Sequence, residues 1–147
     1  MRHIAFILAL LTLQCSAQDH VRWASTSRKL STSDYEVHLV ASIDSLHHIY
    51  ALNTSIYSIR TRVEPQKGPA PFKVIGALRD TAYAKLTRYD SMWREPMTVY
   101  LGSVDLIQVV HFTQWVPKEV VFLVFYTECT DSEVGIVRRE KLVVHFL

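Results

Sequence analysis

A run of seven residues near the C-terminus, residues 120–126, most constrains what this chain can fold into. The run is apolar on both alternating faces, rich in β-branched and aromatic side chains, and too short for an independent helix. It therefore predicts a central strand that is covered on both sides. Residues 141–146 instead alternate between an apolar and a mixed face, which is typical of a half-exposed strand.

A polar, acidic segment separates these two strands and carries a cysteine. Residues 128–133 read Glu-Cys-Thr-Asp-Ser-Glu. A buried strand thus delivers Cys129 to the edge of a loop, and we expect any chemistry of this chain to be found there.

The first 17 residues have the pattern of a secretory signal peptide. Arg2 precedes an apolar core over residues 4–13, and the small residues Cys15-Ser16-Ala17 follow it. The apolar core is too short to span a bilayer. We expect cleavage after Ala17, which leaves residues 18–147 as one domain that is periplasmic or secreted.

Cys15 allows a second interpretation, in which a lipid is attached to it. That signal requires a small residue just before the cysteine, and Gln14 occupies this position. If the leader is removed with Cys15, then Cys129 is the only cysteine left. Structural cysteines of exported proteins normally come in pairs, so a single one is either a reactive thiol or an inert buried residue.

The charge balance gives no reason to expect nucleic acid or an anionic membrane as a partner. Only Arg2 of the 16 Lys and Arg residues lies in the leader, so against 14 Asp and Glu residues the exported part has a net charge of +1 with neutral histidines. No face of the chain is obviously basic in its pattern.

The rest of the exported part reads as a succession of short strands. Alternating or continuous apolar residues predict strands at 35–43, 49–52, 57–63, 72–75, 97–101 and 104–112. Three prolines within residues 65–71 predict a loop. About seven short strands separated by turns favour an all-β chain, an antiparallel β-sandwich.

The common catalytic and metal-binding motifs are missing from the sequence. There is no Gly-rich phosphate loop, no G-x-S-x-G turn and no H-E-x-x-H helix, so we expect no small-molecule cofactor. His47 and His48 are neighbours and would point to opposite faces of a strand, so they would not bind one ion together. We therefore expect no metal site.

Five short segments occur in an order that matches a known family. They are residues 21–23 (VRW), 43–50 (IDSLHHIY, where the family tends to read I-D-x-G-W-H-I-Y), 68–71 (GPAP), 89–93 (YDSMW) and 126–131 (YTECTD). In this order the chain resembles the N-terminal periplasmic domain of the thiol:disulfide interchange protein DsbD, in the free-standing version of Bacteroidetes-type bacteria. The resemblance covers almost all of the exported part, and it implies an immunoglobulin-like β-sandwich.

The resemblance also implies a redox function and a site. In that family the domain takes electrons from a membrane-embedded part of the system and passes them to periplasmic proteins, which implies a redox protein as partner. Two nearby cysteines form the exchanging disulfide. Cys129 matches the first, and the second would be expected at or close to Val134. If the fold is kept, the resemblance implies that Tyr50 is an aromatic neighbour of the sulfur; the alternative for Tyr50 is an ordinary core tyrosine. Glu128 is the neighbour of Cys129 in the sequence and a further candidate for the site.

The single thiol limits what this chain can do. A relay needs a second thiol to release the mixed disulfide that the first one forms. Acidic residues around Cys129, among them Glu128 and Asp131, would also disfavour the thiolate. Three functions stay open: a divergent exchange component whose partner supplies the second sulfur, a non-catalytic protein-binding module, and an envelope-structural sandwich in which Cys129 is simply buried. None of these is an autonomous enzyme.

Overall fold

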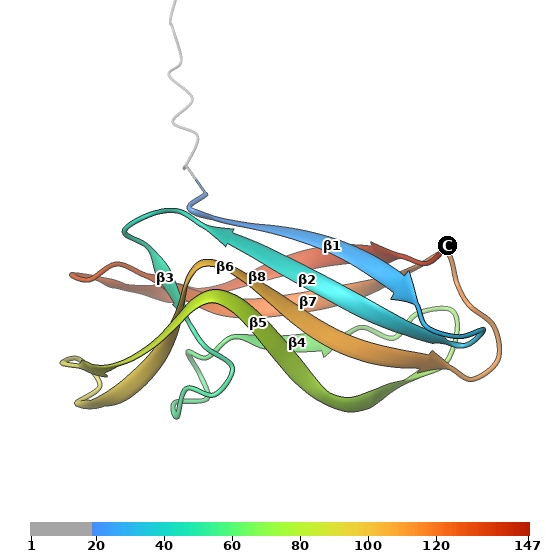
Figure 1. Cartoon of the computed structure of the whole chain (residues 1–147), viewed down its shortest axis with the longest axis horizontal. Helices are drawn as coiled ribbons and strands as arrows, with labels where there is room; N and C mark the ends of the chain where they lie inside the picture. The colour runs from blue at the N-terminus through green and yellow to red at the C-terminus, as the bar shows by residue number, and fades with distance from the viewer. Residues whose placement is uncertain (1–18) are drawn as a thin grey trace, which may run out of the picture.

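The computed structural model describes residues 19–147, which form eight β-strands and no helix (Figure 1). The strands are β1 (Val21–Lys29), β2 (Asp34–Ile43), β3 (His48–Tyr50), β4 (Arg62–Pro65), β5 (Phe72–Asp90), β6 (Glu95–Phe112), β7 (Glu119–Cys129) and β8 (Val134–His145). No helix that could cross a membrane occurs among residues 19–147. The predicted leader, residues 1–17, lies outside the described residues.

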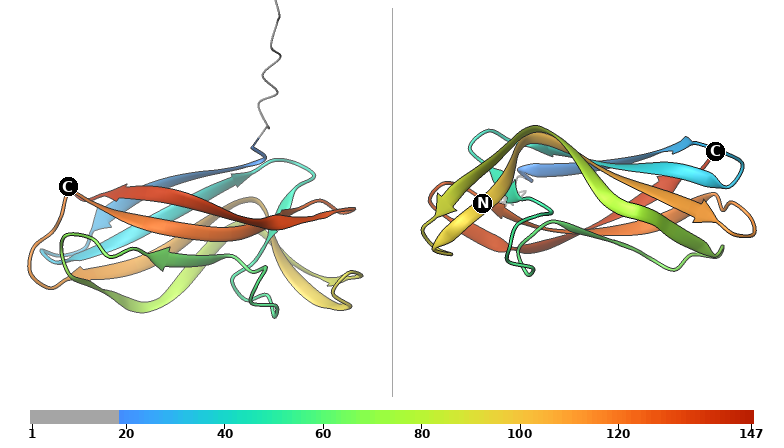
Figure 2. Two further views of the ribbon diagram at one scale, coloured as in Figure 1. Left: turned by 180° about the vertical axis from the view of Figure 1, so that it is seen from behind. Right: turned by 60° about the horizontal axis from the view of Figure 1, so that its bottom comes forward.

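The strands form two antiparallel layers that are joined at one end. The first layer has the order β1, β2, β6, β5, and the second has β8, β7, β4. The short strand β3 pairs with β6 and also with β7, so it connects both layers into one curled sheet. Figure 2 shows the two layers face to face. The predicted antiparallel β-sandwich is confirmed.

The core fills the space between the layers with alternate side chains of the long strands. From β2, β6 and β7 the buried residues include Val37, Leu39, Leu106, Phe122 and Val124. Burying one such side chain contributes about 1.5–3 kcal/mol relative to leaving it exposed. The alternation visible in the sequence is therefore the pattern that packs the sandwich.

Strand β7 is central, as predicted, but only one of its faces is fully covered. It pairs with β8 on one side and with β3 and β4 on the other. Leu123 and Phe125 lie on its outer face and are partly exposed, because nothing but neighbouring side chains covers the outside of a two-layer sandwich. The Arg62 guanidinium, 4.2 Å from the centre of the Phe125 ring, is one of those side chains.

Several predicted strand boundaries were wrong. The strand expected at residues 57–63 begins only at Arg62, because the chain turns before it: the backbone N–H groups of Ile59 and Arg60 donate to the carbonyl of Ile56. Strands expected at 72–75 and 141–146 are the ends of the much longer β5 and β8. The pieces expected at 97–101 and 104–112 belong to one strand, β6.

Candidate functional site

The predicted site lies at the end of the molecule where β3 joins the two layers. The β7–β8 turn and the tip of the β5–β6 hairpin project at this end, next to the β2–β3 connection (Figure 1). An ion pair links the two hairpins, since Arg88 Nη2 lies 2.9 Å from Asp131 Oδ1. The β5–β6 hairpin and the β2–β3 connection therefore lie close to the end of β7.

Cys129 is the last residue of β7 and is buried. Its side chain is only 2% exposed and belongs to a small apolar cluster beside the main core. The cluster consists of Tyr50, Ile59, Met97, Val99 and Cys129, with Ile56, Trp93 and Val134 packed against it. The thiol therefore occupies a packing position instead of a place at the loop edge open to solvent.

The surroundings of the thiol disfavour its charged form. Burial raises the pKa of the Cys129 thiol above its usual value, and the negative charges of Asp90 and Glu128 act in the same direction. The nearby Gly135 backbone and Tyr50 side chain lower the pKa of the thiol but do not offset the burial. Because the thiolate is the nucleophile in disulfide exchange, the folded chain holds this sulfur in its unreactive form near neutral pH.

Tyr50 lies in the same cluster as the sulfur. Its side chain is fully buried, and its hydroxyl donates a hydrogen bond of 2.9 Å to Asp90 Oδ2. Burial raises the pKa of Tyr50 most strongly, and Cys129 and Asp90 raise it further, so the phenol stays protonated. The residue thereby ties β3 to the tip of the β5–β6 hairpin and covers the thiol.

Val134 stands where the resemblance implies a second cysteine. It is the cross-strand partner of Cys129 in the ladder between β7 and β8, and it packs against the same cluster. One step further along, the ladder is irregular: Gly135 and Ile136 on β8 together face Glu128 on β7. Such a bulge leaves an extra residue on one strand and bends that strand locally.

Glu128 does not pair with the sulfur but with basic groups on two other segments. Its Oε1 lies 2.9 Å from His47 Nδ1, and its Oε2 lies 3.5 Å from Arg138 Nε. The side chain is only 8% exposed. Glu128 therefore contributes a buried negative charge beside the Cys129 cluster.

Two histidines near the site have different surroundings. The buried ring of His48 lies against the Arg88 guanidinium. Burial lowers the pKa of His48 most strongly, and the positive charge of Arg88 lowers it further. His47 instead stacks on His20, with 3.9 Å between ring centres and 13° between ring planes. The approach of His20 to His47 and Glu128 was missed from the sequence, because only the folding of distant segments brings them together.

A larger hollow lies elsewhere. It measures about 810 Å³ and lies between residues 66–69, residues 115–121 and the nearby parts of β7 and β8. Cys129 does not line it. A smaller cavity of about 260 Å³ is lined by Cys129 together with His47, Glu128, Gly135 and Arg138. The small cavity is the better candidate for a functional site because ionisable groups converge there.

Comparison with known proteins reveals the fold but no close relative. No family model matches this chain, and no curated protein has a matching sequence. The N-terminal periplasmic domain of ScsB from Proteus mirabilis matches it with a TM-score of 0.61 and 11% identity, over 90% of this chain and 49% of that one. The N-terminal domain of DsbD from Neisseria meningitidis, in the reduced form, matches with a TM-score of 0.52 and 10% identity, over 84% of this chain and 85% of that one. The chain has a DsbD N-terminal-like, immunoglobulin-like fold.

The DsbD N-terminal-like fold is the one that the five sequence segments predicted. At 10–11% identity the similarity concerns the fold alone. The chain spans about half the length of the ScsB structure. What the residues around Cys129 do must therefore be argued from their own chemistry.

Proposed function

We propose that this chain is an exported domain of the DsbD N-terminal-like type that binds a redox protein but does not relay electrons itself. One observation carries the proposal: Val134, which has no sulfur, is the cross-strand partner of the buried Cys129. Export is supported by the predicted leader and by the two similar structures, of which the ScsB domain is described as periplasmic.

The chemistry of disulfide exchange explains why Val134 matters. In the first step a thiolate attacks a disulfide, a mixed disulfide forms, and the partner's other sulfur leaves as a thiolate. Release then requires a second thiol, whose attack on the bonded sulfur closes an intramolecular disulfide and carries two electrons to the partner. A valine opposite Cys129 cannot perform this step. The raised pKa of the Cys129 thiol also disfavours the first one.

The surface around the buried thiol is suited to protein binding. Leu46 in the β2–β3 connection is 86% exposed, Met92 in the β5–β6 turn 60%, and Ile136 near the start of β8 79%. Exposed apolar side chains that gather at one end of a domain are typical of a binding surface. The proposed partner is an extracytoplasmic thiol–disulfide protein, the class with which the DsbD N-terminal family works according to the resemblance.

A second candidate function is supported by the cavity of about 260 Å³ that Cys129 helps to line. If a partner presents a disulfide there, the Cys129 thiolate attacks one of its sulfurs, a mixed disulfide forms, and the partner's other sulfur leaves as a thiolate. Release of Cys129 then requires a thiol that the partner itself supplies. Cys129 is essential in this alternative, whereas in the proposed binding function it is not.

The test is capture of partners from a periplasmic extract, with bound proteins identified by mass spectrometry. We expect the exported chain and Cys129→Ala to capture the same thiol–disulfide proteins. Ile136→Asp should lose them, whereas Leu30→Asp, which changes a partly exposed leucine after β1, should keep them. Capture that is lost in Cys129→Ala and occurs through a reducible bond would favour the exchange function. Captured proteins without any thiol–disulfide chemistry would contradict both.

A further inference from the structure

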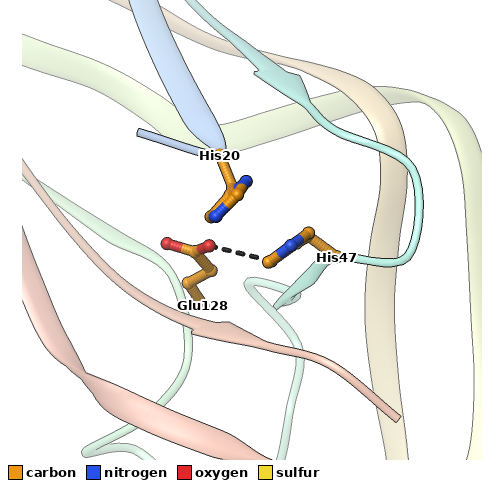
Figure 3. A group of neighbouring side chains, drawn as sticks. All are labelled: His20, His47 and Glu128. Atoms are coloured by element: carbon orange, nitrogen blue, oxygen red, sulfur yellow. Dashed lines mark ion pairs between the residues drawn. The ribbon is translucent and has the colours of Figure 1, made fainter. Parts of the chain in front are cut away.

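Three side chains with metal-binding atoms meet beside the Cys129 cluster. His20 precedes β1, His47 lies in the β2–β3 connection, and Glu128 is on β7. One nitrogen or oxygen atom from each lies within 4.8 Å of those from the other two. Figure 3 shows the three side chains approaching one another from three different parts of the backbone.

Two polar atoms in this group are buried and lack a hydrogen bond. They are His47 Nδ1 and Glu128 Oε2. His47 Nδ1 lies 2.9 Å from Glu128 Oε1, but the two groups are not aligned as a hydrogen bond requires. Most buried polar atoms in folded proteins do have a partner, and an ion is one explanation for those that do not.

The groups around the three side chains fit the outer contacts of a metal site. His20 Nδ1 lies 3.4 Å from Asp44 Oδ2, and Asp44 is itself held by Arg22 at 3.0 Å. A histidine that binds a metal through one ring nitrogen commonly uses the other to contact a carboxylate, which here leaves His20 Nε2 for the ion. Arg138 lies 3.5 Å from Glu128 Oε2 and leaves Oε1 on the side of His47.

The rings of His20 and His47 are stacked, with 3.9 Å between their centres and 13° between their planes. Because the rings lie nearly parallel, one of them has to turn before both nitrogens can point at a single ion.

We propose that His20, His47 and Glu128 form a binding site for one divalent transition-metal ion of the zinc class. Two imidazole nitrogens and one carboxylate oxygen match zinc sites that keep a fourth position open. Calcium and magnesium are disfavoured because they take oxygen ligands. The bound ion would connect the chain before β1 to the β2–β3 connection and β7.

The experiment is a calorimetric titration of zinc chloride into the exported chain, residues 18–147, without a histidine tag. We expect one ion per chain, with binding abolished in His47→Ala, His20→Ala and Glu128→Gln. Asp44→Asn should weaken binding by about 10- to 100-fold, as the loss of an outer contact does in other metal sites. Cys129→Ala should bind normally, because the sulfur is not a ligand.

The matched control is His111→Gln. His111 also pairs with a carboxylate, Asp34 Oδ1 at 2.7 Å, but these residues lie at the other end of β2 from the proposed site. The His111→Gln variant should bind zinc with the same affinity as the unaltered chain. Circular dichroism and unfolding temperature without metal would establish that each variant folds, and zinc should raise the unfolding temperature only of chains that bind it.

Two results would overturn the proposal. The first is no binding of zinc by the unaltered folded chain. The second is binding that persists in His47→Ala or Glu128→Gln, including binding that depends on His20 alone. The ion would then be held by residues near the start of the exported chain or by adventitious surface contacts.

Discussion

Cys129 on β7 and Val134 on β8 face each other across the antiparallel ladder at the end of the sandwich. Directly opposed residues in such a ladder have Cα atoms about 4.5–5.5 Å apart, and disulfides join Cα atoms about 4.4–6.8 Å apart. The backbone thus already has the spacing of a disulfide although one of the two sulfurs is missing.

Val134→Cys should therefore create an intramolecular disulfide with Cys129. The loop that it closes is short, so we expect a gain of about 2 kcal/mol in the free energy of unfolding under oxidising conditions. Thiol titration before and after reduction, together with urea denaturation, measures both effects.

Ile136→Cys is the control for this disulfide. Ile136 is exposed and lies in the bulge that faces Glu128, so its thiol should not pair with Cys129 within one chain. Two free thiols in oxidised Val134→Cys would contradict the prediction, as would equally efficient disulfide formation in the control.

Cys129→Ala should destabilise the fold, because the sulfur fills space among Tyr50, Val99 and Val134. A small truncation in a buried cluster costs about 1–2 kcal/mol. Urea denaturation at neutral pH measures it, with Ser132→Ala in the exposed β7–β8 turn as a control that should stay within about 0.5 kcal/mol of the unaltered chain. Equal stability of the two variants would mean that the sulfur does not pack as the structure shows.

The sequence predicted those strands whose side chains alternate between core and solvent. Residues 35–43 and 104–112 were found because one face of β2 and of β6 is buried while the other is not. Most of β5 is exposed on both faces, so its sequence has no apolar alternation from which the full length of the strand could be predicted. β1 was missed as a strand because small polar residues, Ser25 and Ser27, occupy the face that packs near β8, where their hydroxyls donate to the carbonyls of Val143 and His145.

The sequence predicted only those parts of the site that lie within one segment or that the family resemblance covers. The resemblance implied that Tyr50 is a neighbour of Cys129, and the two residues share a cluster. The burial of Cys129 could not be read from its acidic neighbours, because it follows from how β3 and the β5–β6 hairpin cover the end of β7. His20, His47 and Glu128 are far apart in the sequence, and only strand pairing brings them together.

Stability should fall at alkaline pH, in part because of the buried thiol. Burial raises the pKa of the Cys129 thiol above its usual value in the folded chain, so the unfolded chain loses this proton at a lower pH than the folded chain. The contribution is complete below about pH 9 and is lost as the pH rises from the unfolded toward the folded pKa. Burial also raises the pKa values of Tyr50, Tyr100 and Tyr126 above that of a free tyrosine, which adds a further loss at higher pH.

Urea denaturation at a series of pH values tests this expectation. Between about pH 9 and 10 the free energy of unfolding should fall more steeply for the unaltered chain than for Cys129→Ala, which has no thiol to ionise. Native-state alkylation of Cys129 should follow the same ionisation, with a midpoint above that of a free cysteine, about 8.5. Parallel stability curves combined with a midpoint below that value would contradict the buried, protonated thiol.

Gly135→Ala should destabilise the chain by distorting the bulge that positions Glu128. A Cβ atom at Gly135 would lie far inside van der Waals contact with the backbone carbonyl oxygen of Glu128, and backbone cannot move aside as a flexible side chain can. Overpacking of this kind costs about 1–3 kcal/mol. Because β7 and β8 must separate here, zinc binding through Glu128 should weaken as well.

The control is Gly68→Ala, at a glycine where an added Cβ would meet only Val120 Cγ2 at 3.8 Å, an ordinary contact. Alanine there restricts the unfolded chain and should leave stability unchanged or raise it by up to about 1 kcal/mol. Comparing the two variants by urea denaturation separates the general effect of replacing glycine from the clash with Glu128. If Gly135→Ala were as stable as Gly68→Ala, the close approach of β8 to Glu128 would not be a constraint on the fold, and the position of Glu128 beside His47 would need another cause.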